Sequence, residues 1–137
     1  MMFETIDTPA LLLDLDAVER NVDRYQRAAA AKGVALRPHA KAHKTVELAK
    51  LQIARGAAGV CCAKLGEAEV MAAGGIGDLL VTTPVTGVLK IARLIAIARS
   101  VQVTVVVDDA TNAAALGAAA AAAGMRLDVL VDVDVGQ

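Results

Sequence analysis

Short apolar runs rich in β-branched residues alternate with helical segments along this chain at a nearly even step. The runs begin near residues 34, 59, 79, 101 and 127. Between them apolar residues recur at helical spacing, as in Val88, Ile91 and Ile95. Alternating strands and helices predict a parallel sheet with helical cover. The even step favours (β/α) barrel units over an irregular doubly wound sheet.

Capping residues and glycines predict where these elements begin and end. Asp16 and Glu19 fit a capping box for a first helix, which Gly33 would end. Residues 34–36 are then predicted to form the first strand, and residues 127–135 the last one. The predicted fold class is therefore α/β, a partial (β/α)8 TIM barrel with about five βα units.

The length of the chain limits how much of such a barrel it can form. A complete eight-stranded barrel needs about 250 residues, whereas this chain has 137. No helical segment follows the last predicted strand, so one sheet edge would lack its cover. We expect residues 1–137 to be the N-terminal part of a barrel domain, as the front of a larger protein, a truncated product or half of a split assembly.

Composition excludes several classes of function. The net charge is −1 and the aromatic residues are Phe3 and Tyr25, so neither a basic nucleic-acid surface nor a base-stacking platform is expected. The longest uncharged segment, 110–125, is mostly alanine and too weakly apolar for a membrane span. Cys61 and Cys62 are adjacent, have no CxxC spacing for zinc and are expected to be reduced, which indicates a cytoplasmic protein.

A basic segment follows the first predicted strand: Arg37-Pro38-His39-Ala40-Lys41-Ala42-His43-Lys44. If strand alternation continues through it, Arg37, His39 and Lys41 share one face and point into the mouth of the barrel. A lysine crowded by these cations would lose stability in its charged form. The neutral amine could then attack an aldehyde to form a Schiff base. A solvated basic loop remains the alternative interpretation.

The last predicted strand places three carboxylates on one face, those of Asp128, Asp132 and Asp134. Buried carboxylates are costly unless they reach a polar site or a partner. The strand therefore predicts either a carboxylate-lined mouth that faces Lys41 or an exposed edge strand with a wet face.

Two glycine- and threonine-rich segments are predicted to be turns. Gly74-Gly75-Ile76-Gly77 ends a helix instead of opening one, so it is not a dinucleotide fingerprint. Residues 82–87 lie between a strand and a helix and are predicted to form a turn that caps the helix. Their hydroxyls could alternatively bind a ligand.

The segment Arg37-Pro38-His39-Ala40-Lys41-Ala42-His43-Lys44-Thr45 resembles the cofactor-lysine motif of D-threonine aldolases and eukaryotic-type D-serine dehydratases. Both are pyridoxal-phosphate (PLP) enzymes with an alanine-racemase-like N-terminal barrel. Residues 7–10 and 59–69 are supporting matches, and residues 132–137 are similar to the start of the family's D-x-G-x-x-R-x-G signature. The similarity spans nearly the whole chain in the family's order.

The resemblance implies a role for each residue of the motif. Lys41 would be the Schiff-base lysine, and His39 and His43 would line the cofactor ring or the substrate side. Lys44 would begin the following helix. The implied function is a PLP-dependent lyase that cleaves D-threonine and related D-β-hydroxy amino acids to glycine and an aldehyde. The alternatives are a D-serine dehydratase that forms pyruvate and ammonia, a non-catalytic PLP-binding homeostasis protein, and an α/β fragment without a ligand.

The resemblance also implies parts that these residues do not supply. The signature arginine would lie past Gln137, as would the phosphate-binding loops and the C-terminal β domain. That domain supplies the ligands of a divalent metal of the Mn, Mg or Zn type in the family, and His39 and His43 do not make a metal site here. We therefore expect little or no turnover from this chain alone. The expected partners are a D-amino acid and either a second copy or the complementary part of the barrel.

Overall fold

A computed structural model describes residues 3–136 of the chain. In that part, four strands, five α-helices and two short 3-10 helices follow one another. None of these helices has the length and apolar character needed to cross a membrane. The elements are η1 (Phe3–Thr5), α1 (Leu15–Ala30), η2 (Ala40–Ala42), α2 (Val46–Ala54), β1 (Val60–Cys62), α3 (Leu65–Ala73), β2 (Asp78–Val81), α4 (Val88–Ala98), β3 (Gln102–Val107), α5 (Ala110–Ala122) and β4 (Asp128–Val131).

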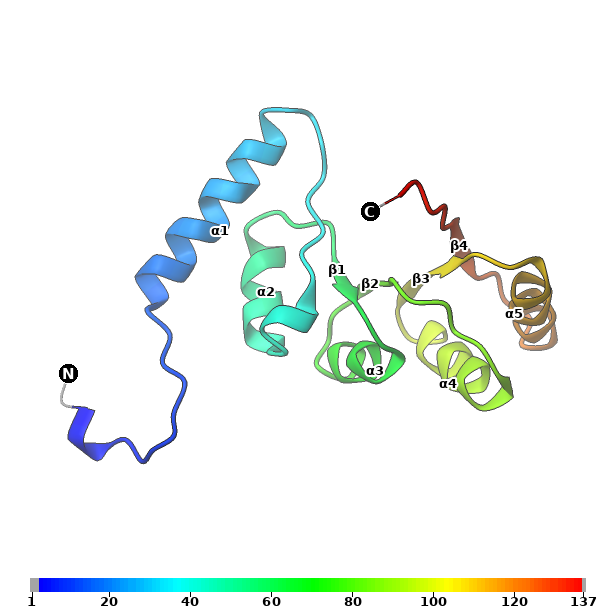
Figure 1. Cartoon of the computed structure of the whole chain (residues 1–137), viewed down its shortest axis with the longest axis horizontal. Helices are drawn as coiled ribbons and strands as arrows, with labels where there is room; N and C mark the ends of the chain where they lie inside the picture. Colours follow the sequence, from blue (N-terminus) through cyan, green and yellow to red (C-terminus); the bar gives the residue numbers. More distant parts are fainter. Residues whose placement is uncertain (1–2, 137) are drawn as a thin grey trace.

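The strands form one parallel sheet in chain order, β1-β2-β3-β4. Figure 1 shows that α3, α4 and α5 all lie along the same side of these strands. A doubly wound sheet would carry helices on both faces, whereas a barrel wall carries them on one. The predicted fold class, a partial barrel built from βα units, is therefore confirmed.

The core lies between the sheet and its helices, because side chains alternate in direction along each strand. Leu79 and Val81 on β2 are fully buried, while Leu80 between them is half-buried on the opposite face. Each fully buried apolar side chain of this size contributes about 1.5–3 kcal/mol to burial. The largest members of this core are Met71, Ile76, Leu79, Leu94, Leu116, Val60, Val81 and Val105.

The prediction of a first strand over residues 34–36 is wrong. This segment runs extended beside β1 and forms an isolated parallel bridge between His39 and Cys61. The Cys61 N–H donates to the Pro38 carbonyl at 2.7 Å. Pro38 has no N–H to return a bond, which interrupts a continuous ladder at this edge.

The predicted capping box of α1 is also wrong, because the helix begins one residue before Asp16. Asp14 is the N-cap, and its Oδ1 accepts a hydrogen bond from the Ala17 N–H at 2.9 Å. Asp16 lies in the first turn, where a carboxylate interacts favourably with the helix dipole. Glu19 instead pairs with Arg55 on the next helix, at 2.7 Å.

Helix α1 depends on a few polar contacts, because it carries no buried residue. The Arg55 guanidinium binds both Asp23 and Glu19, and the Gln26 side chain donates to the Gly56 carbonyl at 2.9 Å. We expect Arg55→Ala to raise amide hydrogen exchange throughout α1 and to leave exchange in β2 and β3 unchanged. High salt should reproduce the effect in the wild type, since exposed ion pairs are screened.

Arg99→Ala is the matched control for this change. Arg99 is exposed beyond the end of α4, and no ion pair involves it among residues 3–136. Its removal should leave α1 exchange at the wild-type level. Equal protection of α1 in Arg55→Ala and the wild type would contradict this account of how the helix is held.

Candidate active site

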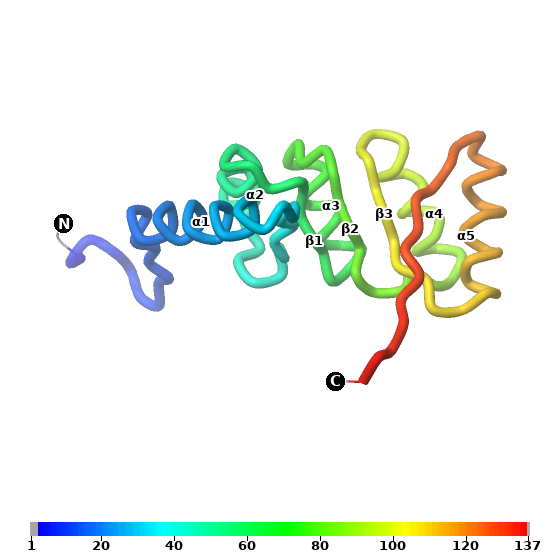
Figure 2. The backbone as a smooth tube through the Cα atoms, turned by 90° about the horizontal axis from the view of Figure 1, so that it is seen from above, coloured from blue at the N-terminus to red at the C-terminus, as the bar shows by residue number. Residues whose placement is uncertain are grey.

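Lys41 lies on η2, at the edge of the sheet where the strands end. Figure 2 shows the η2 segment and the chain that leaves β4 at the same edge. The carboxyl edge of a parallel barrel wall is where such folds carry their active sites. Lys41 is exposed, and within residues 3–136 no ion pair engages its ammonium group. The lysine that the motif singles out is thus an accessible amine at the functional end of the sheet.

Arg37 does not join Lys41, contrary to the alternation prediction. Its guanidinium makes two 2.9 Å bonds to the carboxylate of Asp78, at the opposite end of the sheet, where β2 begins. The hydrogen bond to Asp78 raises the pKa of Arg37. Alternation fails because the chain turns into η2 directly after His39. The cation nearest in sequence to Lys41 on its strand-exit side is therefore a histidine, and Arg37 is a structural residue.

His39 uses both of its ring nitrogens for protein contacts. Nδ1 accepts the Lys41 backbone N–H at 3.3 Å, and Nε2 lies 3.3 Å from the Thr82 hydroxyl. The Thr82 hydroxyl in turn donates to the Cys62 carbonyl at 3.3 Å. Because a backbone N–H can only donate, Nδ1 must carry a lone pair and the ring proton must lie on Nε2. This arrangement requires the neutral imidazole.

The surroundings of His39 lower its pKa, chiefly through burial and next through the positive charge of Lys41, with Glu67 acting in the opposite direction. The unfolded chain then takes up the proton first as the pH falls below the ordinary value of 6.5. We expect the free energy of unfolding to fall as the pH drops through this region, before the carboxylates titrate. Urea unfolding at several pH values should show this slope in the wild type and a smaller slope in His39→Asn. Equal slopes would contradict the assignment.

His43 and Lys44 occupy unusual positions between η2 and α2. The Nδ1 of His43 accepts the Thr45 N–H at 3.1 Å, while its Nε2 is buried without a partner among the described residues. A cofactor contact of His43 stays a prediction. The prediction that Lys44 begins the next helix is wrong, because Lys44 has a left-handed φ of 52° and α2 begins at Val46. The Lys44 N–H donates to the Ala40 carbonyl at 2.8 Å, which closes the turn before the helix.

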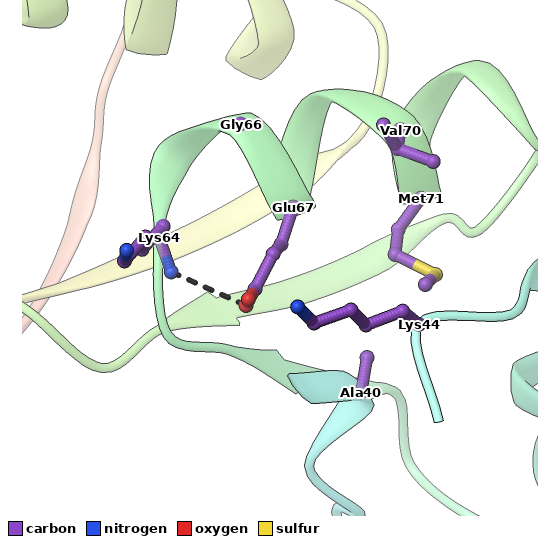
Figure 3. Close-up of a pocket in the computed structure, with 7 residues that line it drawn as sticks. All are labelled: Ala40, Lys44, Lys64, Gly66, Glu67, Val70 and Met71. Atoms are coloured by element: carbon purple, nitrogen blue, oxygen red, sulfur yellow. Dashed lines mark hydrogen bonds between the residues drawn. The ribbon is translucent and has the colours of Figure 1, made fainter. Parts of the chain in front are cut away.

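A cavity of about 420 Å³ lies between η2 and the first turns of α3. Figure 3 shows Lys44 extending across it toward the carboxylate of Glu67. Glu67 accepts the backbone N–H groups of Ala63, at 2.7 Å, and Lys64, at 3.3 Å, and so caps α3. Lys41 is not among the residues that line this cavity. Glu67 in the segment 59–69 therefore has a structural reason to be there, one that its sequence pattern did not reveal.

The carboxylates near the end of the chain form a separate group. Asp108, Asp132 and Asp134 line a hollow of about 670 Å³ that does not include Lys41. Strand β4 ends at Val131, well before the predicted residue 135, and all of its residues are exposed. These observations favour the exposed edge strand over a carboxylate-lined mouth facing Lys41.

The adjacent cysteines are free thiols on opposite faces of β1. Burial raises the pKa of Cys62 to about 12, with the charge of Glu67 as the next cause. Burial also raises the pKa of the half-buried Cys61. Neither is an activated thiolate. Across residues 3–136, no group of three or more histidine, cysteine or acidic side chains could hold a metal ion.

A family model for the alanine racemase N-terminal domain matches residues 13–137. The chain therefore belongs to this family. The crystal structure of a D-threonine aldolase from Filomicrobium marinum superposes with a TM-score of 0.93 and 46% identity, covering 96% of this chain and 36% of that one.

Three curated relatives extend the comparison. The chain is 47% identical to a D-threonine aldolase of an Arthrobacter species over 132 residues, which is 96% of this chain and 35% of the relative. It is also 47% identical to a 3-hydroxy-D-aspartate aldolase of Paracoccus denitrificans, over 96% of this chain and 34% of the relative. A D-threo-3-hydroxyaspartate dehydratase of a Delftia species is 35% identical, with 95% and 34% covered. The chain thus spans about a third of the length of the curated relatives it matches.

The chemistry of the residues at the carboxyl edge fits the aldehyde end of pyridoxal phosphate. That group needs an accessible primary amine, and Lys41 provides one on a turn fixed by hydrogen bonds. Thr82 is the residue at this edge that sequence reasoning did not assign to the Lys41 site, since the segment 82–87 was predicted to be a turn. Its position directly after a buried strand was the available signal.

Proposed function

We propose that this chain supplies the cofactor lysine of a PLP-dependent lyase that cleaves D-threonine and related D-β-hydroxy amino acids to glycine and an aldehyde. The observation that carries the proposal is the exposed Lys41 at the carboxyl edge of a barrel wall that belongs to the alanine racemase N-terminal family. When bound, pyridoxal phosphate supplies an electron sink for bond cleavage next to the amino group.

The residues of this chain would hold and present the amine. Lys41 binds the cofactor through its side chain, while its backbone N–H is held by the ring of His39. The strand ends below it are fixed by the bond from Thr82 N–H to the Cys62 carbonyl, at 2.9 Å. The attachment point is therefore set by the sheet edge and does not depend on a free loop.

Aldol cleavage is favoured over dehydration by the degree of similarity. The two aldolases are 47% identical to this chain, whereas the dehydratase is 35% identical. A non-catalytic PLP-binding protein of the same barrel type is the remaining alternative. A divalent metal, a cytoplasmic location and a second copy or further barrel portion also belong to the proposal, supported by the resemblance and, for the location, by the free cysteines.

The function is best tested in a chimera, because this chain spans a third of its relatives. The matching third of the Arthrobacter D-threonine aldolase would be replaced by residues 1–137 of this chain. We expect the chimera, supplied with PLP and Mn²⁺, to release glycine and acetaldehyde from D-threonine and nothing from L-threonine. The same graft into the Delftia dehydratase is expected to support less turnover.

Lys41→Ala in the chimera is the control, and it should abolish product formation while the fold, followed by circular dichroism, stays intact. A folded chimera that binds PLP at Lys41 and releases no glycine would favour the non-catalytic alternative. Better support of dehydration than of aldol cleavage would favour the dehydratase.

A further inference from the structure

A continuous chain of hydrogen bonds joins Lys41 to the ends of two strands. It runs from the Lys41 N–H to His39 Nδ1, from His39 Nε2–H to the Thr82 hydroxyl, and from that hydroxyl to the Cys62 carbonyl, each at 3.3 Å. The direction of every bond is fixed, because it begins at a backbone N–H and ends at a backbone carbonyl. One ring thereby connects η2 to β1 and to the residue that follows β2.

We propose that His39 is a positioning residue, which holds Lys41 in place as a neutral imidazole with its proton on Nε2 and leaves the cofactor no free ring nitrogen. This inference rests on the proposed function of Lys41. It differs from the role in the resemblance, where His39 lines the cofactor ring.

Protonation of His39 would break the connection at its first link. The imidazolium carries N–H groups at both nitrogens, so Nδ1 would face the Lys41 N–H as donor against donor. The charged groups around the ring are the Lys41 ammonium and, from α3, the Glu67 carboxylate, and the Thr82 hydroxyl faces it from the end of β2. The burial and the Lys41 charge that lower its pKa both favour the neutral form, and Glu67 opposes them.

Three substitutions separate the two links of the ring. In His39→Asn the amide oxygen can still accept the Lys41 N–H, as asparagine does at helix N-caps, but it cannot reach Thr82. His39→Phe keeps a ring of similar size and loses both links. Thr82→Val removes only the hydroxyl, and Thr111→Val on the exposed start of α5 is its matched control.

The test uses the whole chain with PLP as the probe, and it measures the rate of covalent attachment by borohydride trapping and peptide mass across pH. In the wild type the rate should fall as His39 is protonated, and nitrogen-15 NMR should place the ring proton on Nε2. His39→Asn should keep most of the rate at neutral pH and lack this acid limb. His39→Phe should attach about tenfold more slowly, with Thr82→Val between it and the wild type and Thr111→Val unchanged.

A ring proton on Nδ1, an unchanged rate in His39→Phe, or an acid limb that persists in His39→Asn would overturn the proposal. If His39→Phe does not fold, the tautomer and the rates of His39→Asn and Thr82→Val still decide it. Failure of the proposed function looks different, because the wild type would then attach no PLP at Lys41 whichever nitrogen carried the proton.

Discussion

Lys41→Ala should abolish the visible absorbance that PLP acquires when it is bound covalently to this chain. The side chain is exposed, so its removal opens no cavity and the fold should persist. Attachment needs an amine that alanine lacks, and Lys41 is the lysine on the turn fixed by His39. The measurement is an absorbance titration of the wild type and the variant with PLP, with circular dichroism as the check on folding.

Lys90→Ala is the control, because Lys90 is an exposed lysine on α4. It should bind PLP like the wild type. Arginine at position 41 keeps the charge and cannot form the linkage, so Lys41→Arg should behave like Lys41→Ala. Full absorbance in either Lys41 variant would show that another lysine carries the cofactor.

Gly59→Ala should destabilise the fold by about 3 kcal/mol. A Cβ at this position would overlap the guanidinium of Arg37 and lie 2.5 Å from the Asp78 carbonyl oxygen, and Gly59 has a φ of +155°. The substitution therefore strains the backbone and displaces one partner of the Arg37–Asp78 ion pair. Urea denaturation should show a lower midpoint, and the segment beside β1 should lose hydrogen-exchange protection.

The same chemical change at Gly117 is the matched control. Gly117 lies inside α5, and a Cβ there meets nothing within 4 Å. Gly117→Ala should stabilise the chain by up to about 1 kcal/mol, because alanine is the better helix former. A Gly59→Ala variant as stable as the wild type would contradict the close approach of Arg37 to β1.

The layout of the sheet could be predicted from the sequence, since strand and helix periodicities are local. The strands near residues 59, 79 and 101 and the helices between them lie where predicted. The segment 34–36 could not be placed by composition, because one proline at the sheet edge prevents a ladder that the apolar residues favour. The last strand ends early because β3, its partner, ends at Val107.

The candidate site was predicted less completely than the fold, for reasons of distance along the chain. The motif identified Lys41, but alternation carried past a turn placed Arg37 beside it. Arg37 instead binds Asp78, forty-one residues away. Thr82 reaches His39 from forty-three residues away, and no local pattern marks such a contact.

Borohydride reduction of the whole chain with PLP, followed by peptide mapping, tests the central claim most directly. The account predicts that the pyridoxyl group is found on Lys41 and that Lys44 and Lys64, which line the neighbouring cavity, stay unmodified. Modification of Lys44 or Lys64 in place of Lys41, or an even spread over the exposed lysines, would contradict it.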